Sequence, residues 1–287
     1  MSKYKITTDY TCDLSEDFWR ENPTERVIMP YSICGKEYYT DEDMDYKMYY
    51  KLLKEGNMAT TSQVVQYDAE ERFSKIMEKG YDIIHLGLSG GVSSSHENFT
   101  PTVNSLKEKF PDRKITIVNT LNGSGGLGIM VYEANKNMKN GMSYDDNVKY
   151  LESIVPNVYP LFVVDDLIHL KRGGRLSLVE ATLGTLLGIK PLLALDKNGK
   201  ICVEAKARGT KKAHIAMVEK TLETIIPEDN DFIIITHADN IEGAEKLGNL
   251  IKEKINVDIM YAPLTKVVGS HVGKDTLAIF YKGKARF

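Results

Sequence analysis

The sequence predicts an α/β fold of two domains, an N-terminal one with a mostly parallel, Rossmann-like sheet and a C-terminal one with a mixed sheet. In the first half, apolar runs of strand length alternate with amphipathic runs of helix length, a pattern typical of parallel strands joined by helices. In the second half, two apolar runs flank Lys-Asn-Gly at residues 197–199, and Asn-Gly in that setting indicates an antiparallel hairpin. We place the boundary near Asn157, which gives domains of residues 1–157 and 158–287.

The elements follow from these patterns in order along the chain. Apolar runs predict strands at residues 3–8, 26–34, 82–88, 114–119 and 161–164. The amphipathic runs between them predict helices at residues 15–22, 45–54, 68–79, 97–110, 126–139 and 144–154. Beyond Pro160 come hairpin strands at 191–196 and 200–207, helices at 211–225 and 244–254, and strands at 232–236, 258–262 and 276–281. Since no low-complexity linker separates the halves, we expect them to pack closely, with a ligand site in the cleft between them.

Composition excludes several classes of protein. The chain has 287 residues, 42% of them hydrophobic, which is enough for a real core. Lys and Arg number 37 against 40 Asp and Glu, so a nucleic-acid partner is not expected. No apolar stretch approaches the roughly 20 residues of a membrane helix, so at most transient contact with a membrane surface is expected. The absence of a signal-like start and of paired cysteines favours a cytoplasmic protein.

Two motifs suggest enzymes, and we favour neither. Gly-Leu-Ser-Gly-Gly from Gly87 matches the nucleophile elbow of α/β-hydrolases, with Ser89 as nucleophile. A donor-rich run of serines follows it where the helix of a nucleophile elbow should begin, which argues against this motif. A serine hydrolase or esterase is therefore kept only as the alternative function. The run Gly123 to Gly128 matches a dinucleotide fingerprint, but no strand ending in an acidic residue follows about 20 positions later. These glycines are better explained by a tight turn and a helix start close to the sheet.

Three polar loops, at residues 60–63, 89–95 and 119–124, are interpreted as lying after strands. Loops at the carboxyl ends of parallel strands converge on one edge of the sheet, where hydroxyl and backbone N–H groups hold an anion such as a carboxylate or phosphate. Helix capping is the alternative role for each single hydroxyl. The second half adds cations at residues 171–175, Arg208 after a strand, and a predicted tight loop at residues 269–273 around His271.

In their order and spacing, these motifs resemble the DegV family of bacterial fatty-acid-binding proteins over essentially the whole chain. The quoted matches are Asp-Tyr-Thr-Cys-Asp-Leu from Asp9, Thr-Ser-Gln-Val from Thr61, Val-Ser-Ser-Ser from Val92, Leu-Lys-Arg-Gly-Gly-Arg-Leu-Ser from Leu170, Gly-Ile-Lys-Pro-Leu-Leu from Gly188, Lys-Ala-Arg-Gly-Thr-Lys-Lys-Ala from Lys206 and Gly-Ser-His-Val-Gly from Gly269.

The resemblance implies one long-chain fatty acid in an apolar tunnel between two α/β domains, with no other cofactor and no metal. It implies that hydroxyls of Thr61 and Ser93 hold the carboxylate. The wider ligand-binding set that we expect is Thr61, Ser62, Ser93, Ser94, Ser95, Asn119, Gly126, Arg208 and His271.

The resemblance also implies a partner, a separate ATP-dependent fatty acid kinase that converts the presented lipid to an acyl phosphate for phospholipid synthesis. Arg208 and His271 would assist that transfer, and Arg172 and Arg175 would face the partner or the anion. The chain would then carry no complete active site of its own. A carrier or sensor of another amphiphile, with no kinase partner, is the remaining alternative.

Overall fold

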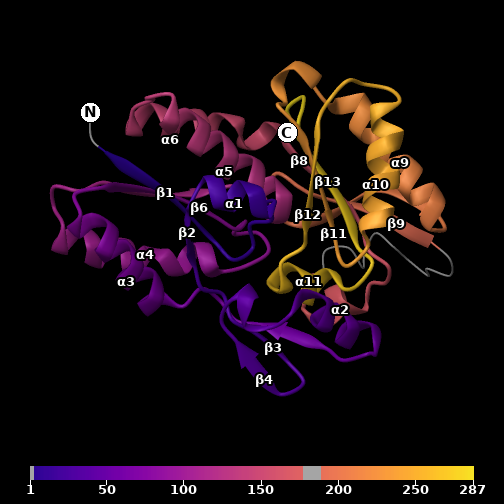
Figure 1. Ribbon diagram of the computed structural model, residues 1–287, viewed down its shortest axis with the longest axis horizontal. Coiled ribbons are helices and arrows are strands. Elements are labelled where there is room, and N and C mark those ends of the chain that lie inside the picture. Colours follow the sequence, from indigo (N-terminus) through magenta and orange to yellow (C-terminus); the bar gives the residue numbers. More distant parts are fainter. Residues whose placement is uncertain (1–2, 177–188) are drawn as a thin grey trace.

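The computed structural model describes residues 3–176 and 189–287, and its first half is built on a parallel sheet (Figure 1). The strand order is β2-β1-β6-β7, with β1 (Tyr4–Asp9), β2 (Glu25–Val27), β6 (Asp82–Gly87) and β7 (Ile115–Asn119). Helices α3 (Gln66–Glu78) and α4 (Ser95–Lys109) pack together on this sheet, and α5 (Ser124–Lys139) and α6 (Tyr144–Ile154) form a second pair against it. The short helix α1 (Glu16–Glu21) follows β1. The predicted parallel α/β half is confirmed.

The second half is built on a six-stranded mixed sheet in the order β10-β9-β8-β13-β11-β12. Its strands are β8 (Val158–Val163), β9 (Ile189–Leu195), β10 (Ile201–Arg208), β11 (Ile233–His237), β12 (Ile259–Pro263) and β13 (Leu277–Lys282). All neighbours pair antiparallel except β11 and β12, which are parallel. Helices α9 (Thr210–Thr224) and α10 (Ile241–Lys252) cover one face, and the predicted β9–β10 hairpin is confirmed.

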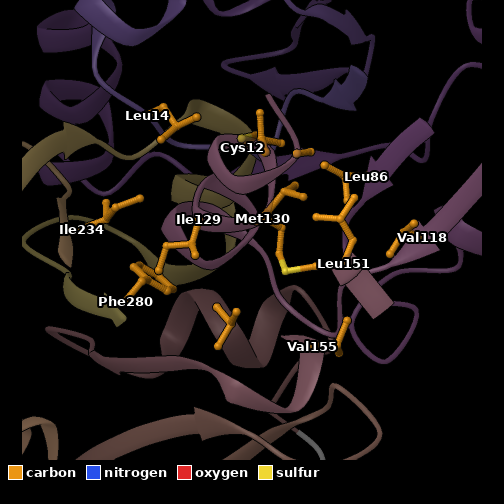
Figure 2. Close-up of a cluster of buried hydrophobic side chains, with 14 of the residues drawn as sticks. Cys12, Leu14, Leu86, Val118, Ile129, Met130, Leu151, Val155, Ile234 and Phe280 are labelled. Atoms are coloured by element: carbon orange, nitrogen blue, oxygen red, sulfur yellow. The ribbon is translucent and has the colours of Figure 1, made fainter. Parts of the chain in front are cut away.

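Helix α5 joins the two halves because it packs on both large sheets. Eleven of its sixteen residues are buried, and its glycines allow the close approach. A Cβ on Gly125 would lie 2.5 Å from a ring carbon of Phe280 on β13. The glycine run therefore serves a helix start close to a sheet, as predicted. Figure 2 shows the resulting core, in which Leu86 and Val118 of the first sheet and Ile234 and Phe280 of the second surround α5.

A small antiparallel sheet, in the order β4-β3-β5, corrects one prediction. Its strands are β3 (Tyr31–Ile33), β4 (Lys36–Tyr38) and β5 (Ala59–Thr61), and the helix α2 (Tyr46–Lys54) lies between β4 and β5. The single strand predicted at residues 26–34 is wrong, because β2 and β3 belong to different sheets. Pro30 lies between them and has no N–H to donate to a continuous ladder. Strand β5 had not been predicted.

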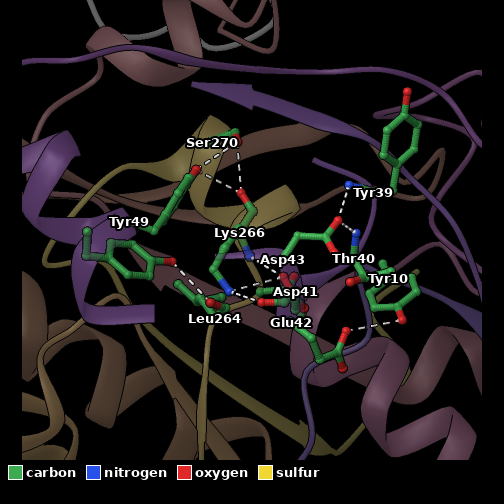
Figure 3. A network of polar contacts seen from close by, with 12 residues as sticks. Tyr10, Tyr39, Thr40, Asp41, Glu42, Asp43, Tyr49, Leu264, Lys266 and Ser270 are labelled. Carbon is green, nitrogen blue, oxygen red and sulfur yellow. Dashed lines mark hydrogen bonds and ion pairs between the residues drawn. The ribbon is translucent and has the colours of Figure 1, made fainter. Parts of the chain in front are cut away.

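The small sheet and α2 dock on α11 (Lys266–Val272), which also corrects the predicted tight loop at residues 269–273. Within this helix, a Cβ on Gly269 would overlap the hydroxyl of Tyr50 on α2. The glycine there serves close helix packing, and Gly273, with a φ of +78°, ends the helix. Figure 3 shows the polar part of this contact, where the hydroxyl of Tyr49 donates to the carbonyl of Lys266 at 2.9 Å.

The remaining differences lie at element ends and in short segments. Strand β8 begins at Val158, not at residue 161, although Pro160 lies within it. The proline is tolerated because β8 pairs with β9 only at Phe162, so no ladder bond to β9 is lost at Pro160. The short elements α7 (Ile168–Arg172), η1 (Asp41–Asp43), η2 (Val155–Asn157) and η3 (Pro227–Asp229) had not been predicted.

The last strand of the parallel sheet ends at residue 119, and the first strand of the mixed sheet begins at residue 158. Because the two halves share one hydrophobic core, the domain boundary at residue 157 stays a prediction. Of the quoted motif residues, Ser177 and Gly188 lie outside the described residues. Among the helices of residues 3–176 and 189–287, none has the length and apolar character needed to cross a membrane.

Candidate functional site

A cavity with largely apolar walls lies between the two halves. Its volume is about 850 Å³, including the part open to solvent. Met29, Leu88 and Val92 of the first half line it. The apolar residues of the second half that line it are Pro160, Phe162, Leu170, Leu195, Ile201, Leu264, Val267, Val268, Val272, Ala278 and Phe280.

Four of the residues singled out from the sequence line this cavity together, namely Thr61, Ser93, Arg175 and His271. They come from four separate segments: the end of β5, the loop before α4, the turn after α7, and α11. The chain therefore brings hydroxyls, an imidazole and a guanidinium to one apolar space.

Thr61 and His271 are in direct contact, with 2.8 Å between Thr61 Oγ1 and His271 Nε2. Burial lowers the pKa of His271 to about 4, and the positive charge of Arg175 acts in the same direction, so the ring is neutral at pH 7. Its Nδ1 is buried and has no hydrogen-bond partner within the described residues. A Cβ on Gly173 would lie 2.5 Å from this Nδ1, so the glycine turn after α7 packs directly against the ring.

The Ser93 loop lies beside the loop that follows β5. The Ser93 hydroxyl donates to Ser95 Oγ at 2.9 Å and accepts from the backbone N–H of Ser95 at 3.2 Å. Ser95 Oγ accepts from the backbone N–H of Val64 at 3.2 Å, and Gln63 Nε2 donates to Ser94 Oγ. Two of the three predicted polar loops are therefore joined by hydrogen bonds.

Arg175 brings a half-buried positive charge to the cavity. Its Nε donates to the carbonyl of Val92 at 2.9 Å, and its Nη1 donates to the carbonyl of Gly173 at 2.5 Å. Burial lowers the pKa of Arg175, and no acidic side chain of residues 3–176 or 189–287 forms an ion pair with it. Carbonyl groups hold this guanidinium in place without neutralising its charge.

The other predicted site residues do not line the cavity. Ser62 and Ser94 are exposed in the two neighbouring loops, and Ser95 is buried at the first turn of α4. Arg172 and Arg208 are exposed at the ends of α7 and β10. Their roles stay predictions.

The third polar loop has a structural role in this arrangement. Asn119 Oδ1 accepts the backbone N–H groups of Gly90 and Leu121, each at 3.2 Å. A Cβ on Gly126 would overlap the side chain of Asn122, so this glycine packs within the loop and helix start. Binding roles for Asn119 and Gly126 stay predictions.

Three further hydroxyls line the cavity, those of Thr11, Ser124 and Thr276. Ser124 ends the third polar loop, but none of the three was predicted individually as a ligand-binding residue. Thr11 and Ser124 donate to the buried carboxylates of Asp9 and Asp13. Burial raises the pKa of Asp13 to about 7. The signal in the sequence was the Asp-x-Thr-x-Asp spacing at residues 9–13, which places a hydroxyl between two acids after a strand.

Ser89 has contacts that fit a structural role and not that of a nucleophile. It is fully buried, its hydroxyl donates to the carbonyl of Gly199 at 2.8 Å, and its Oγ accepts from the N–H of Gly91 at 3.1 Å. No imidazole among the described residues hydrogen-bonds to it. Ser89 therefore holds the turn of the β9–β10 hairpin against the loop before α4. Within the described chain, no cluster of three or more His, Cys, Asp or Glu could hold a metal ion.

The fold and cavity define an α/β protein with a largely apolar chamber between two sheets. The chain belongs to the DegV family, because the sequence pattern of this family of uncharacterised proteins matches residues 3–284. A DegV domain-containing protein of Clostridium perfringens is 34% identical, with 100% of this chain and 99% of that protein covered.

Solved structures agree with this assignment. The fatty-acid-binding DegV family protein of Streptococcus agalactiae is 28% identical and superimposes with a TM-score of 0.87, over 99% of this chain and 100% of that one. The fatty acid kinase B3 protein of Streptococcus pneumoniae, solved with linoleic acid, has a TM-score of 0.83 at 20% identity, over 98% of this chain and 100% of that one. At that identity the likeness shows the shared fold.

Proposed function

We propose that this protein binds one long-chain fatty acid in the cavity between its halves and presents the carboxylate to a separate ATP-dependent fatty acid kinase. The observation that carries the proposal is a largely apolar chamber to which four separate segments bring the polar side chains of Thr61, Ser93, Arg175 and His271. The fatty-acid-binding relative from S. agalactiae supports the choice of ligand. We also propose the boundary at residue 157 as the division between the domains that enclose the lipid, and a cytoplasmic location.

The acyl chain supplies most of the driving force. A chain of about 16 carbons, at about 0.8 kcal/mol per buried CH₂, contributes more than ~10 kcal/mol before the costs of binding. The head group therefore needs only to be oriented. The Thr61 and Ser93 hydroxyls are suited to this, because their present partners are a neutral imidazole and another hydroxyl. A carboxylate is a strong hydrogen-bond acceptor, so each hydroxyl can direct its O–H to it.

The kinase step is a phosphoryl transfer in which this chain positions the nucleophile. A carboxylate oxygen forms a bond to the γ-phosphorus of ATP, the bond from that phosphorus to the bridging oxygen breaks, and ADP leaves. The product is an acyl phosphate. Exposed Arg172 and Arg208 are available to a partner surface, whereas Arg175 and His271 lie at the lipid.

The first test is ligand binding by the full chain. We expect a fatty acid to be extracted from protein purified from a bacterial host and identified by mass spectrometry. After delipidation, Thr61→Val and Ser93→Ala should each weaken palmitate binding by roughly 1–3 kcal/mol, about 5- to 150-fold. Thr60→Val is the matched control, because Thr60 precedes Thr61 on β5 but is exposed and does not line the cavity. A consistently empty protein, or unchanged affinity in both variants, contradicts the proposal.

The second test is transfer. With ATP and a fatty acid kinase catalytic subunit, the loaded protein should yield an acyl phosphate that hydroxylamine traps as a hydroxamate, and no product should form without that subunit. Arg208→Ala should retain palmitate binding but lose product formation. Lys246→Ala, at an exposed position on α10, is the control. Full product formation by Arg208→Ala would contradict the assigned role of Arg208.

A further inference from the structure

A second pocket opens beside the apolar cavity and is lined by a different kind of surface. Its volume is about 830 Å³, including open solvent, and its lining residues are Gly90, Gly91, Val92, Ser93, Ser94, Glu97, Gly174, Arg175, Lys200 and Ile201. Four of these also line the apolar cavity: Val92, Ser93, Arg175 and Ile201. The two spaces therefore meet at the Ser93 hydroxyl, to which we assign the carboxylate, and at the Arg175 guanidinium.

The walls of this side pocket come from segments that are fixed to one another. One wall is the loop before α4, and the other is the turn of the β9–β10 hairpin. The Ser89 hydroxyl donates across to the carbonyl of Gly199 at 2.8 Å. A Cβ on Gly91 would overlap the backbone of Asn198 and Gly199, so the two segments are in close contact there. Lys200 follows this turn directly, and its position relative to Ser93 is therefore defined.

The charged groups of the side pocket carry a positive excess. Arg175 and Lys200 are cations and Glu97 is the one acid of the described lining, so the net charge of this lining is +1. Neither cation forms an ion pair with an acidic side chain of the described ranges. Such a pocket suits an anionic group that is too polar for the apolar cavity.

We propose that this side pocket is the binding site for the phosphoryl group of an acyl phosphate. The inference rests on the proposed fatty-acid function and assigns the phosphate of the acyl phosphate product to the side pocket. When the carboxylate gains a phosphoryl group, the head group extends by one phosphate beyond the acyl carbon. Ser93 and Arg175 retain the acyl end at the junction, and the phosphate reaches the side pocket, where Lys200 faces it. Glu97, in the first turn of α4, opposes the phosphate and limits how tightly the product is held.

The test compares two ligands with the same acyl chain. Palmitate probes the carboxylate site, and 2-oxoheptadecylphosphonate, a stable mimic of palmitoyl phosphate, probes the side pocket as well. Lys200→Ala should weaken binding of the phosphonate about fivefold, and less at high salt, because the charge is at an exposed position. Glu97→Gln should strengthen phosphonate binding by a similar factor. Palmitate affinity should change less than about twofold in both variants, since neither residue lines the apolar cavity.

Lys197→Ala is the matched control, because Lys197 is an exposed lysine in the same hairpin turn that does not line the side pocket. It should leave the affinity for both ligands unchanged. If palmitate binds but Lys200→Ala and Glu97→Gln leave phosphonate affinity unchanged, or change it no more than Lys197→Ala does, the phosphate site is overturned while the fatty-acid function stands. If the wild-type chain binds no palmitate, the proposed function fails, and this inference fails with it.

Discussion

Replacing Lys266 with methionine tests the contact that holds the small sheet and α2 to the cavity. Lys266 is 3% exposed, and its ammonium group donates to the backbone carbonyl of Asp41 and lies 3.8 Å from Asp41 Oδ1. Its backbone N–H donates to the same carboxylate at 3.1 Å (Figure 3). The methionine keeps the volume of the chain but removes the charge, so Asp41 loses its cation.

The expected loss follows from the burial of the pair. Breaking a buried ion pair by removing one partner costs about 3–5 kcal/mol. The lower end, about 3 kcal/mol, applies because the Asp41 side chain keeps 20% exposure and retains a backbone donor. The double variant Asp41→Asn/Lys266→Met leaves neither charge buried and should recover to within about 1 kcal/mol of the wild type.

The pH dependence of the single variant has a definite sign. Burial raises the pKa of Asp41, while the charge of Lys266 lowers it. Without Lys266, the folded pKa of Asp41 rises further above its unfolded value. A carboxyl group whose folded pKa is raised destabilises the fold at higher pH and ceases to do so as it becomes protonated. The deficit of Lys266→Met should therefore shrink as the pH falls from 7 toward 4.

Urea unfolding measures both effects. Trp19 is the single tryptophan of the chain and reports the transition by fluorescence, with far-UV circular dichroism as a second probe. The reasoning is refuted if Lys266→Met is as stable as the wild type at pH 7. It is also refuted if the double variant is no more stable than Lys266→Met alone.

Two further predictions concern the site itself. The His271 ring should remain neutral by NMR until the pH falls to about 4, the pKa to which burial lowers it. The unfolded chain takes up this proton near pH 6.5, so the free energy of unfolding should decrease as the pH falls from 6.5 to 4. A titration midpoint near 6.5 would contradict the burial of the ring. Gly91→Ala should cost about 1–3 kcal/mol and weaken palmitate binding, because the added Cβ overlaps the hairpin turn at Asn198. Ser94→Ala, an exposed change in the same loop, should leave stability unchanged, and equal effects of the two substitutions would exclude this packing argument.

The sequence was informative where one local pattern decides the structure. Alternating apolar and amphipathic runs predicted the parallel half, and Asn198-Gly199 predicted the β9–β10 hairpin. It was misleading where a distant contact decides. The strand predicted at residues 26–34 is divided at Pro30 between two sheets. The glycines around His271 suggested a loop, yet Gly269 lies within helix α11. There the missing side chain leaves room for Tyr50, more than 200 positions earlier in the chain.

The same distinction applies to the candidate site. Thr61, Ser93, Arg175 and His271 could be selected from motifs, and they do line one cavity. The sequence did not reveal that Thr61 and His271 are in direct contact, because 210 positions separate them and neither local pattern refers to the other. Lys200 was not selected for a related reason. A lysine after a hairpin turn is typical of a solvated surface, and only the packing of that turn on Gly91 places it beside Ser93.

The position of the site between the halves has a consequence for ligand entry. The polar groups around the cavity come from both sides of the junction, with Thr61 and Ser93 on one side and Arg175 and His271 on the other. The Thr61–His271 hydrogen bond, at 2.8 Å, crosses that junction at the proposed carboxylate site. In the proposed complex, the carboxylate meets the Thr61 hydroxyl where His271 already contacts it, so contacts to the ligand come partly at the expense of a contact between the halves. A fatty acid should consequently stabilise the fold through its acyl chain, which fills the space between the sheets, more than through its head group.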